Sequence, residues 1–310
     1  MSATYPLRFL SARKTLPTTP TSIAVYVLTF GGGMVSGDNI DMDVVVSPGC
    51  TLSLLSQASL KVFKQRAVSI KQWGNVPISN QRDVRQTING LVSSNSLLAI
   101  LPEPVTCFSS ASFTQTQHIT LEANASLVLL DWFTCGRMSR GEEWEFDSCS
   151  STNTIDIEGY GTIVRDSWRL VDDNILVDIP LLGHDDGGDT LMSGNHDDDL
   201  EPITEDFAKL SSQPKPRSYA ARVMPYRCLA NVILIGPRTQ QLVARVLSEF
   251  ATISISKKNP IQDGVIWSAS PLVNQHGCIL RAAALDTQSM RALLQQHNSS
   301  ISRFAFNYRK

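Results

Sequence analysis

Short apolar runs separated by turn-forming residues dominate the chain between positions 23 and 180. The run at 23–30 is rich in β-branched and aromatic residues and ends at three glycines, while 40–46 begins by alternating apolar with acidic residues. Further runs lie at 51–56, 97–101, 118–121 and 126–130, each bounded by Gly, Pro, Asn or Ser. Such runs, with few helical periods between them, predict a mainly β fold of layered, sandwich-like sheets. No fixed-period repeat that would identify a solenoid is apparent.

The pattern changes in the C-terminal third. Residues 229–235 predict a strand, and five apolar residues at helical spacing predict an amphipathic helix over 238–250. Two strands at 265–270 and 278–284 follow, and Asp286 is a suitable N-cap for a second helix that carries Met290, Leu293 and Leu294. We therefore expect a smaller α+β portion with about two helices that packs against the β body or continues it.

Between these parts lies an acidic stretch with almost no aromatic or β-branched residues. Of the chain's 29 acidic and 27 basic residues, nine acidic residues and only Lys209 among the bases fall between Gly183 and Gln213. A stretch of this composition buries too little to order itself, which predicts a flexible insertion. His184 and His196 lie within it, but no fixed histidine spacing defines a metal site there. The predicted organisation is a β body over 1–182, an acidic insertion over 183–216 and an α+β portion over 217–310.

Charge and cysteine content narrow the function classes. The chain without the acidic stretch keeps 20 acidic and 26 basic residues, but its Lys and Arg are scattered singly, with no basic stripe of the kind that nucleic-acid-binding faces carry. An acidic protein partner is the simpler use of this charge. The six cysteines form no C-x-x-C pair, and neither a secretory signal nor a run of ~20 apolar residues is found. We expect a cytoplasmic protein with reduced thiols.

A glycine-rich loop at 31–38 is the first candidate for chemistry. It lacks the Gly-Lys-Ser/Thr of a phosphate cradle and leads into a strand rather than a helix. The glycines therefore favour a strand-to-strand turn with positive φ angles. Asp38, at the end of the loop, could cap this turn or bind a metal.

The densest group of chemically capable residues follows the apolar run at 126–130. Asp131, Cys135 and Glu142 lie there together with Arg137 and Arg140. A hydrolase or transferase could use Asp131, Cys135 and Glu142, with Cys135 as nucleophile and His118 as base. The alternative is an ion-pair network that ties a loop to the end of a strand, with Cys135 as a small buried hydrophobe. Neither Cys135 nor His118 has a known catalytic signature around it, and no G-x-S-x-G motif occurs in the chain.

A set of short motifs follows in order over about residues 5–170: 5–8 (YPLR), 26–38 (YVLTFGGGMVSGD), 56–63 (SQASLKVF), 101–105 (LPEPV), 125–132 (ASLVLLDW), 136–142 (GRMSRGE) and the pair Arg165–Asp166. The order of these motifs resembles the UreD (UreH) family of urease accessory proteins, in its eukaryotic, fungal-type form. Ala58 and Leu60 depart from the Gly and Thr of the family pattern. The acidic stretch looks like an insertion of this lineage.

The resemblance implies a non-enzymatic scaffold and metallochaperone. Such a protein binds the urease apoprotein together with a UreF-like accessory protein and a UreG-like GTPase, and assists GTP-dependent nickel insertion. UreD-like proteins are thought to conduct nickel through an internal water-filled passage, which should hold Ni²⁺ only weakly through oxygen or imidazole ligands. No tightly bound cofactor is expected, only transient Ni²⁺. Asp38, Asp131 and Glu142 are the predicted ligands along this path, and a purely binding role without a nickel path is the other alternative.

Overall fold

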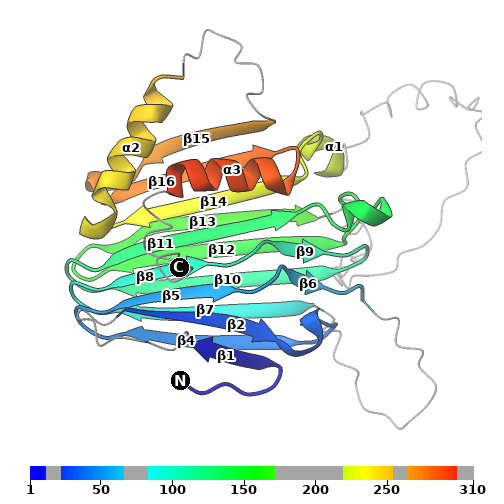
Figure 1. Cartoon of the computed structure of the whole chain (residues 1–310), viewed down its shortest axis with the longest axis horizontal. Coiled ribbons are helices and arrows are strands. Elements are labelled where there is room, and N and C mark those ends of the chain that lie inside the picture. The colour runs from blue at the N-terminus through cyan, green and yellow to red at the C-terminus, as the bar shows by residue number, and fades with distance from the viewer. Residues whose placement is uncertain (12–21, 66–82, 172–218, 254–263, 299–310) are drawn as a thin grey trace, which may run out of the picture.

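A computed structural model of the chain describes residues 1–11, 22–65, 83–171, 219–253 and 264–298. The described residues form two sheets and a few helices, as the sequence predicts (Figure 1). The larger sheet holds β1 (Leu7–Ser11), β2 (Ser22–Thr29), β5 (Thr51–Ser56), β8 (Leu97–Leu101), β11 (Ser126–Thr134), β14 (Cys228–Ile235), β16 (Gly277–Ala284) and β15 (Val265–Pro271) in that order, with a side branch of β3 (Gly33–Met34), β6 (Leu60–Val62) and β9 (Val105–Cys107). The second sheet has the order β13 (Gly161–Val171), β12 (Ser148–Ile157), β10 (Ser112–Leu121), β7 (Val84–Val92) and β4 (Asn39–Val46).

The chain passes repeatedly from one sheet to the other. From β2 it runs to β4 in the second sheet, returns to β5, and continues through β7, β8, β10 and β11 in the same alternation. Neighbouring strands that the chain reaches by this alternation are therefore parallel, as in the pairs β2–β5, β5–β8 and β8–β11. Parallel neighbours need a long crossover connection, and here the strand in the opposite sheet supplies it. The body is thus a coil of strands rather than a set of hairpins.

The pairing register shows why this coil of strands is difficult to recognise from the sequence. Ser22 pairs with Thr51, 29 positions further on, and Leu97 pairs with Ser126 at the same separation. The turn between them is longer, because Thr51 pairs with Leu97, 46 positions further on. The excess of 46 over 29 is 17 residues. A repeat of 29 residues is therefore interrupted once within three turns.

The space between the two sheets holds the main apolar core. Strand β4 alternates strictly between exposed and buried positions, and its Ile40 and Met42 enter this core together with Phe113 of β10 and Leu129 of β11. Strand β11 is buried along its whole length because both of its faces are covered. Leu127, Leu129 and Phe133 face the second sheet, whereas the alternate residues pack beneath helices. By the same alternation Asp131 points into the space between the sheets.

The C-terminal strands continue the larger sheet, since β14 pairs antiparallel with β11. Helices α2 (Gln240–Ala251) and α3 (Thr287–Asn298) cover the outer face of this part of the sheet, while the short α1 (Tyr219–Val223) lies near the start of β14 (Figure 1). Both predicted helices are present. Asp286 caps α3 by accepting a hydrogen bond of 2.8 Å from the backbone N–H of Ser289. The predicted acidic insertion at 183–216 lies outside the described residues, so the division into 1–182, 183–216 and 217–310 stays a prediction.

Candidate functional site

A cavity of about 320 Å³ lies between the two sheets. Its lining comes from both sides, with Leu54 and Asp131 on the larger sheet and Met42, Ile88 and Gln117 on the second. Most of the lining is apolar, but the glutamines of β7 and β10 and the carboxyl of Asp131 interrupt it. An apolar cavity with a few convergent polar groups is the usual form of a small-ligand site.

Asp131 is the buried acid of this cavity, with 4% of its surface exposed. Its Oδ1 accepts a hydrogen bond of 3.1 Å from Gln115 Nε2, and its Oδ2 accepts bonds of 3.2 Å from Asn153 Nδ2 and 3.4 Å from Trp168 Nε1. All three donors come from the second sheet, so the carboxyl joins the two layers. The Trp168 ring stacks on Phe133 at 4.0 Å between centroids, which fixes the indole beside the carboxyl.

Burial raises the pKa of Asp131 above its ordinary value, although the hydrogen bonds from the surrounding side chains oppose this shift. Desolvation acts against the charged form of a carboxyl, whereas amide donors favour it. The group is therefore an acid whose charge depends strongly on what enters the cavity. A cation beside it would favour the carboxylate.

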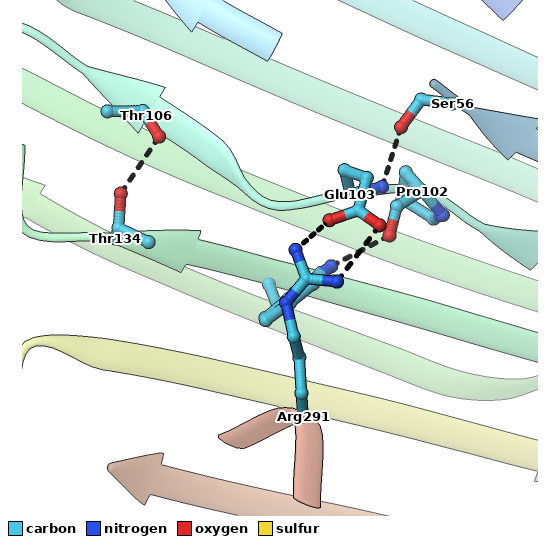
Figure 2. A network of polar contacts seen from close by, with 7 residues as sticks. Ser56, Pro102, Glu103, Thr106, Thr134 and Arg291 are labelled. Atoms are coloured by element: carbon cyan, nitrogen blue, oxygen red, sulfur yellow. Dashed lines mark hydrogen bonds and ion pairs between the residues drawn. The ribbon is translucent and has the colours of Figure 1, made fainter. Parts of the chain in front are cut away.

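A second hollow, a surface pocket of about 350 Å³, adjoins the cavity. Gln57, Ala58, Ser59 and Glu103 line both hollows and so form the boundary between them. Figure 2 shows how this boundary is held: Arg291 reaches from α3 to both carboxylate oxygens of Glu103, whose backbone N–H donates to Ser56 Oγ at 2.6 Å. Ala58 is not among the residues with positive φ, so its turn forms without the glycine of the family pattern.

Asp38 caps its own loop. Its Oδ2 accepts a hydrogen bond of 2.8 Å from the backbone N–H of Val35, and its N–H donates to the Val35 carbonyl at 3.0 Å. Gly31, Gly32 and Gly37 of this loop have positive φ angles, as predicted for a strand-to-strand turn. The side chain of Asp38 does not line the cavity.

Glu142 forms a bidentate ion pair with Arg137, and Arg137 Nε lies 2.7 Å from Glu142 Oε2. The hydrogen bond from Arg137 is the largest cause that lowers the pKa of Glu142. The guanidinium in turn lies 4.2 Å above the centre of the Phe108 ring. This is the ion-pair arrangement that ties the loop to the strand end, and Glu142 does not line the cavity. The structure therefore does not bring Asp38, Asp131 and Glu142 together, and the nickel role of Asp38 and Glu142 stays a prediction.

The structure also keeps apart Cys135 and His118, the nucleophile and base of the alternative, catalytic hypothesis. Cys135 is fully buried, and burial raises its pKa to about 11, so the thiol is protonated at neutral pH. His118 lies on the outer face of β10 and pairs with Asp156 at 2.6 Å. A nucleophilic thiol needs a base within hydrogen-bond reach and a lowered pKa, and Cys135 has neither His118 nor such a pKa.

The glutamines are the site residues that the sequence analysis missed. Gln115 and Gln117 occupy inward positions of β10 between Phe113 and Ile119, and Gln86 lies on the neighbouring β7. The period-2 pattern of residues 113–121 carried the signal, because polar residues at inward positions of a strand mark a polar interior. Within the described ranges, no group of three or more His, Cys, Asp or Glu residues is close enough to hold a metal ion, and no helix is long and apolar enough to cross a membrane.

Comparison with known proteins gives the family. The model of the UreD urease accessory protein family matches residues 1–186. The chain is 32% identical to urease accessory protein 4 of Cryptococcus neoformans var. grubii, over 95% of this chain and 83% of that protein. The chain belongs to the UreD family of urease accessory proteins. It is also 29% identical to urease accessory protein D of Arabidopsis thaliana, over 96% of the chain and 89% of the plant protein.

Membership of the UreD family assigns the chain to urease maturation as an accessory protein. The UreD family model covers the β body, which contains the cavity, Asp131 and the boundary at Glu103. The relatives extend the match through the C-terminal strands and helices, since a UreD-like protein of Schizosaccharomyces pombe is 26% identical over 98% of the chain.

Proposed function

We propose that this UreD family member is a non-enzymatic scaffold in the cytoplasm that passes Ni²⁺ to the urease apoprotein through its inter-sheet cavity. In this role it binds the apoprotein together with a UreF-like accessory protein and a UreG-like GTPase, whose GTP hydrolysis drives the transfer. The observation that carries the nickel part is the cavity itself, which has a buried carboxyl at Asp131 and a second carboxylate, Glu103, at its boundary with a surface pocket.

The ligand chemistry suits transfer rather than storage. Ni²⁺ accepts oxygen and imidazole ligands, and soft thiolates hold such ions far more tightly. Burial raises the pKa of Cys135 and Cys278 to about 11 and that of Cys228 to about 12, and none of these three thiols lines the cavity, so an ion inside it meets no thiolate from them. An ion that enters the cavity meets single carboxylates and amides, and a few weak contacts allow both entry and departure.

Co-purification tests the scaffold. A tagged chain expressed with the urease apoprotein, the UreF-like protein and the UreG-like GTPase should elute with all three in one complex. Failure of the chain to associate with any of them at low and moderate salt would overturn the proposed role.

Replacement of Asp131 by Asn separates nickel transfer from a purely binding role. The variant should join the complex in normal amount but leave urease with less nickel, because the carboxylate that favours the cation is lost. Normal nickel loading by this variant would favour a chain that only binds its partners. The same measurement on Asp38→Asn and Glu142→Gln tests the two carboxylates that have other partners in the structure.

A further inference from the structure

The outer face of the second sheet is uncovered among the described residues. Helices α2 and α3 pack on the larger sheet instead, and every outward position of β4, β7, β10, β12 and β13 is exposed or half-buried. The strand pairing places these positions in four rows that cross the whole sheet from β4 to β13. The first row runs from Asn39 to Arg169, and the third runs from Asp43 to Arg165.

Small side chains with hydroxyl groups fill the middle of this face. Thr114 and Thr116 of β10 and Thr152 of β12 belong to its first two rows. The longer side chain of His118 lies along the sheet, because its Nε2 is 2.6 Å from a carboxylate oxygen of Asp156 on the neighbouring strand. Short side chains leave a flat centre, against which another sheet packs at a distance of about 10 Å.

Opposite charges lie at the two edges of the face. Asp41 and Asp43 point outward from the edge strand β4, and Arg165 and Arg169 point outward from the edge strand β13. None of these four side chains forms an ion pair with another described residue. The edges lie roughly 19 Å apart across the sheet, beyond the ~10 Å over which charges interact at an ionic strength of about 0.1 M. One chain alone therefore leaves both edges without an opposite charge.

We propose that this face binds the same face of a second copy of the chain, about a two-fold axis that runs along β10. This rotation lays β4 of each copy over β13 of the other and keeps every row over itself. Asp43 then faces Arg165 of the second copy at both ends of the interface, and Asp41 lies between Arg165 and Arg169. A two-fold axis across the strands would instead lay each β4 over the other, and like charges would face each other.

The third arginine of the face also fits this arrangement. Arg85 of β7 lies over Ser150 of β12 in the second copy, whose hydroxyl accepts hydrogen bonds. Aligned sheets cross at about 30°, which moves the outermost strands by roughly 5 Å, less than the ~7 Å between rows. The charged side chains at the edges are long enough to follow this shift.

The area of the face is sufficient for a specific dimer. Five strands and four rows cover about 650 Å² on each chain, or about 1,300 Å² in the pair, at the lower end of the range of specific interfaces. Because the face is mostly polar, we expect a dimer in equilibrium with the monomer. This association goes beyond the proposed function, since the outward side chains do not line the cavity through which nickel is proposed to pass.

Sedimentation velocity of the purified full-length chain at increasing concentration tests the dimer. The wild type should shift from monomer to dimer. Asp43→Arg and Arg165→Asp each bring like charges together at both contacts, and each should raise the dissociation constant about tenfold or more. An equal mixture of the two variants should regain the wild-type affinity. In that mixed pair the new arginine faces the new aspartate at one contact, and a native pair remains at the other.

Two further variants locate the interface. Thr116→Arg places a long charged side chain beside the proposed axis and should leave the chain monomeric, whereas Ala244→Arg on the exposed part of α2 should dimerise normally. Thermal unfolding checks that each variant is folded. A wild type that stays monomeric, a dimer that tolerates Thr116→Arg, or a charge-variant mixture that does not associate would overturn the proposal. A monomer whose binding to the urease apoprotein is lost in Thr116→Arg would also overturn it and would assign the face to that protein. These readouts do not involve nickel, so their failure leaves the proposed passage to its own tests.

Discussion

The carboxyl of Asp131 is buried between donors that favour its charge and surroundings that oppose it. The balance raises its pKa, with desolvation as the main cause. An acid whose pKa is higher in the folded than in the unfolded chain contributes stability below its unfolded pKa and loses it as the pH rises through the folded pKa. This residue therefore makes the fold less stable at neutral than at mildly acidic pH, which is an unusual sign for a carboxyl.

Replacement of Asp131 by Asn tests this sign. In the wild type, the unfolding free energy should decline as the pH rises above about 4. In the variant this decline should be smaller, because the group that titrates there is gone. Urea denaturation of both proteins at several pH values between 4 and 8 measures it. Parallel curves for the wild type and the variant would contradict a raised pKa at this position.

Glu142 has the opposite effect on how the stability of the fold changes with pH. Its pKa is lowered, first by the hydrogen bond from Arg137, so its contribution is present above the unfolded pKa and is lost as the pH falls through the folded pKa. Glu142→Gln should lower Tm by roughly 2–5 °C at pH 7, with a difference that shrinks towards pH 3. Glu249→Gln breaks the exposed pair with Arg245 on α2 and is the matched control, with a change within about 1 °C. A Tm unchanged by Glu142→Gln, together with low urease activation, would instead assign the residue to nickel.

At the scale of elements, helix α3 closes the boundary between the two hollows. Arg291 binds Glu103 and also lies over the ring of Trp132, 5.4 Å from its centre, while the Trp132 indole donates to the Pro102 carbonyl at 2.8 Å. These contacts join the C-terminal helix to the segment between β8 and β9 across 188 positions of sequence. The C-terminal portion thus shapes the entry to a cavity that belongs to the β body.

A double-mutant cycle measures this contact. Glu103→Gln and Arg291→Gln should each lower the unfolding free energy slightly, and their coupling should be about 0.5–1 kcal/mol, because both side chains are partly exposed and solvent screens them. Thermal or urea denaturation of the two single variants and the double variant provides the values. Strictly additive effects would show that the pair does not hold the boundary.

The sequence predicted the elements that carry a strong hydrophobic pattern. It missed those in which polar residues or additional residues obscure that pattern. Both C-terminal helices follow from apolar positions at helical spacing. Strand β12 (SCSSTNTIDI) escaped because serine, threonine and asparagine fill most of its positions. The coil escaped because 17 extra residues interrupt its repeat of 29. At the site, Asp131 stood out as an acid at the end of an apolar run, whereas Gln86 and Gln117 acquire their meaning only when the coil brings β7 and β10 together.

At the scale of the whole molecule, the coil explains why a protein with so much apolar core keeps an internal cavity. Two sheets that face each other along several turns enclose a continuous interior, and polar residues on inward positions keep part of it free of apolar packing. The cavity is the feature on which the proposed function depends. A change that fills it without disturbing the outer surface therefore tests the account most directly.

Ile88→Trp makes this change, since Ile88 is buried and lines the cavity from β7. Leu91→Trp places the same side chain on the outer face of the same strand, where Leu91 is 40% exposed, and is the matched control. Each variant is produced with the complete urease system, its thermal stability and its recovery in the complex are checked, and the nickel in purified urease is counted. The account predicts a normal complex with Ile88→Trp but at least a fivefold loss of nickel per urease active site, and no loss with Leu91→Trp. Full nickel content in urease matured by a folded Ile88→Trp chain would contradict it.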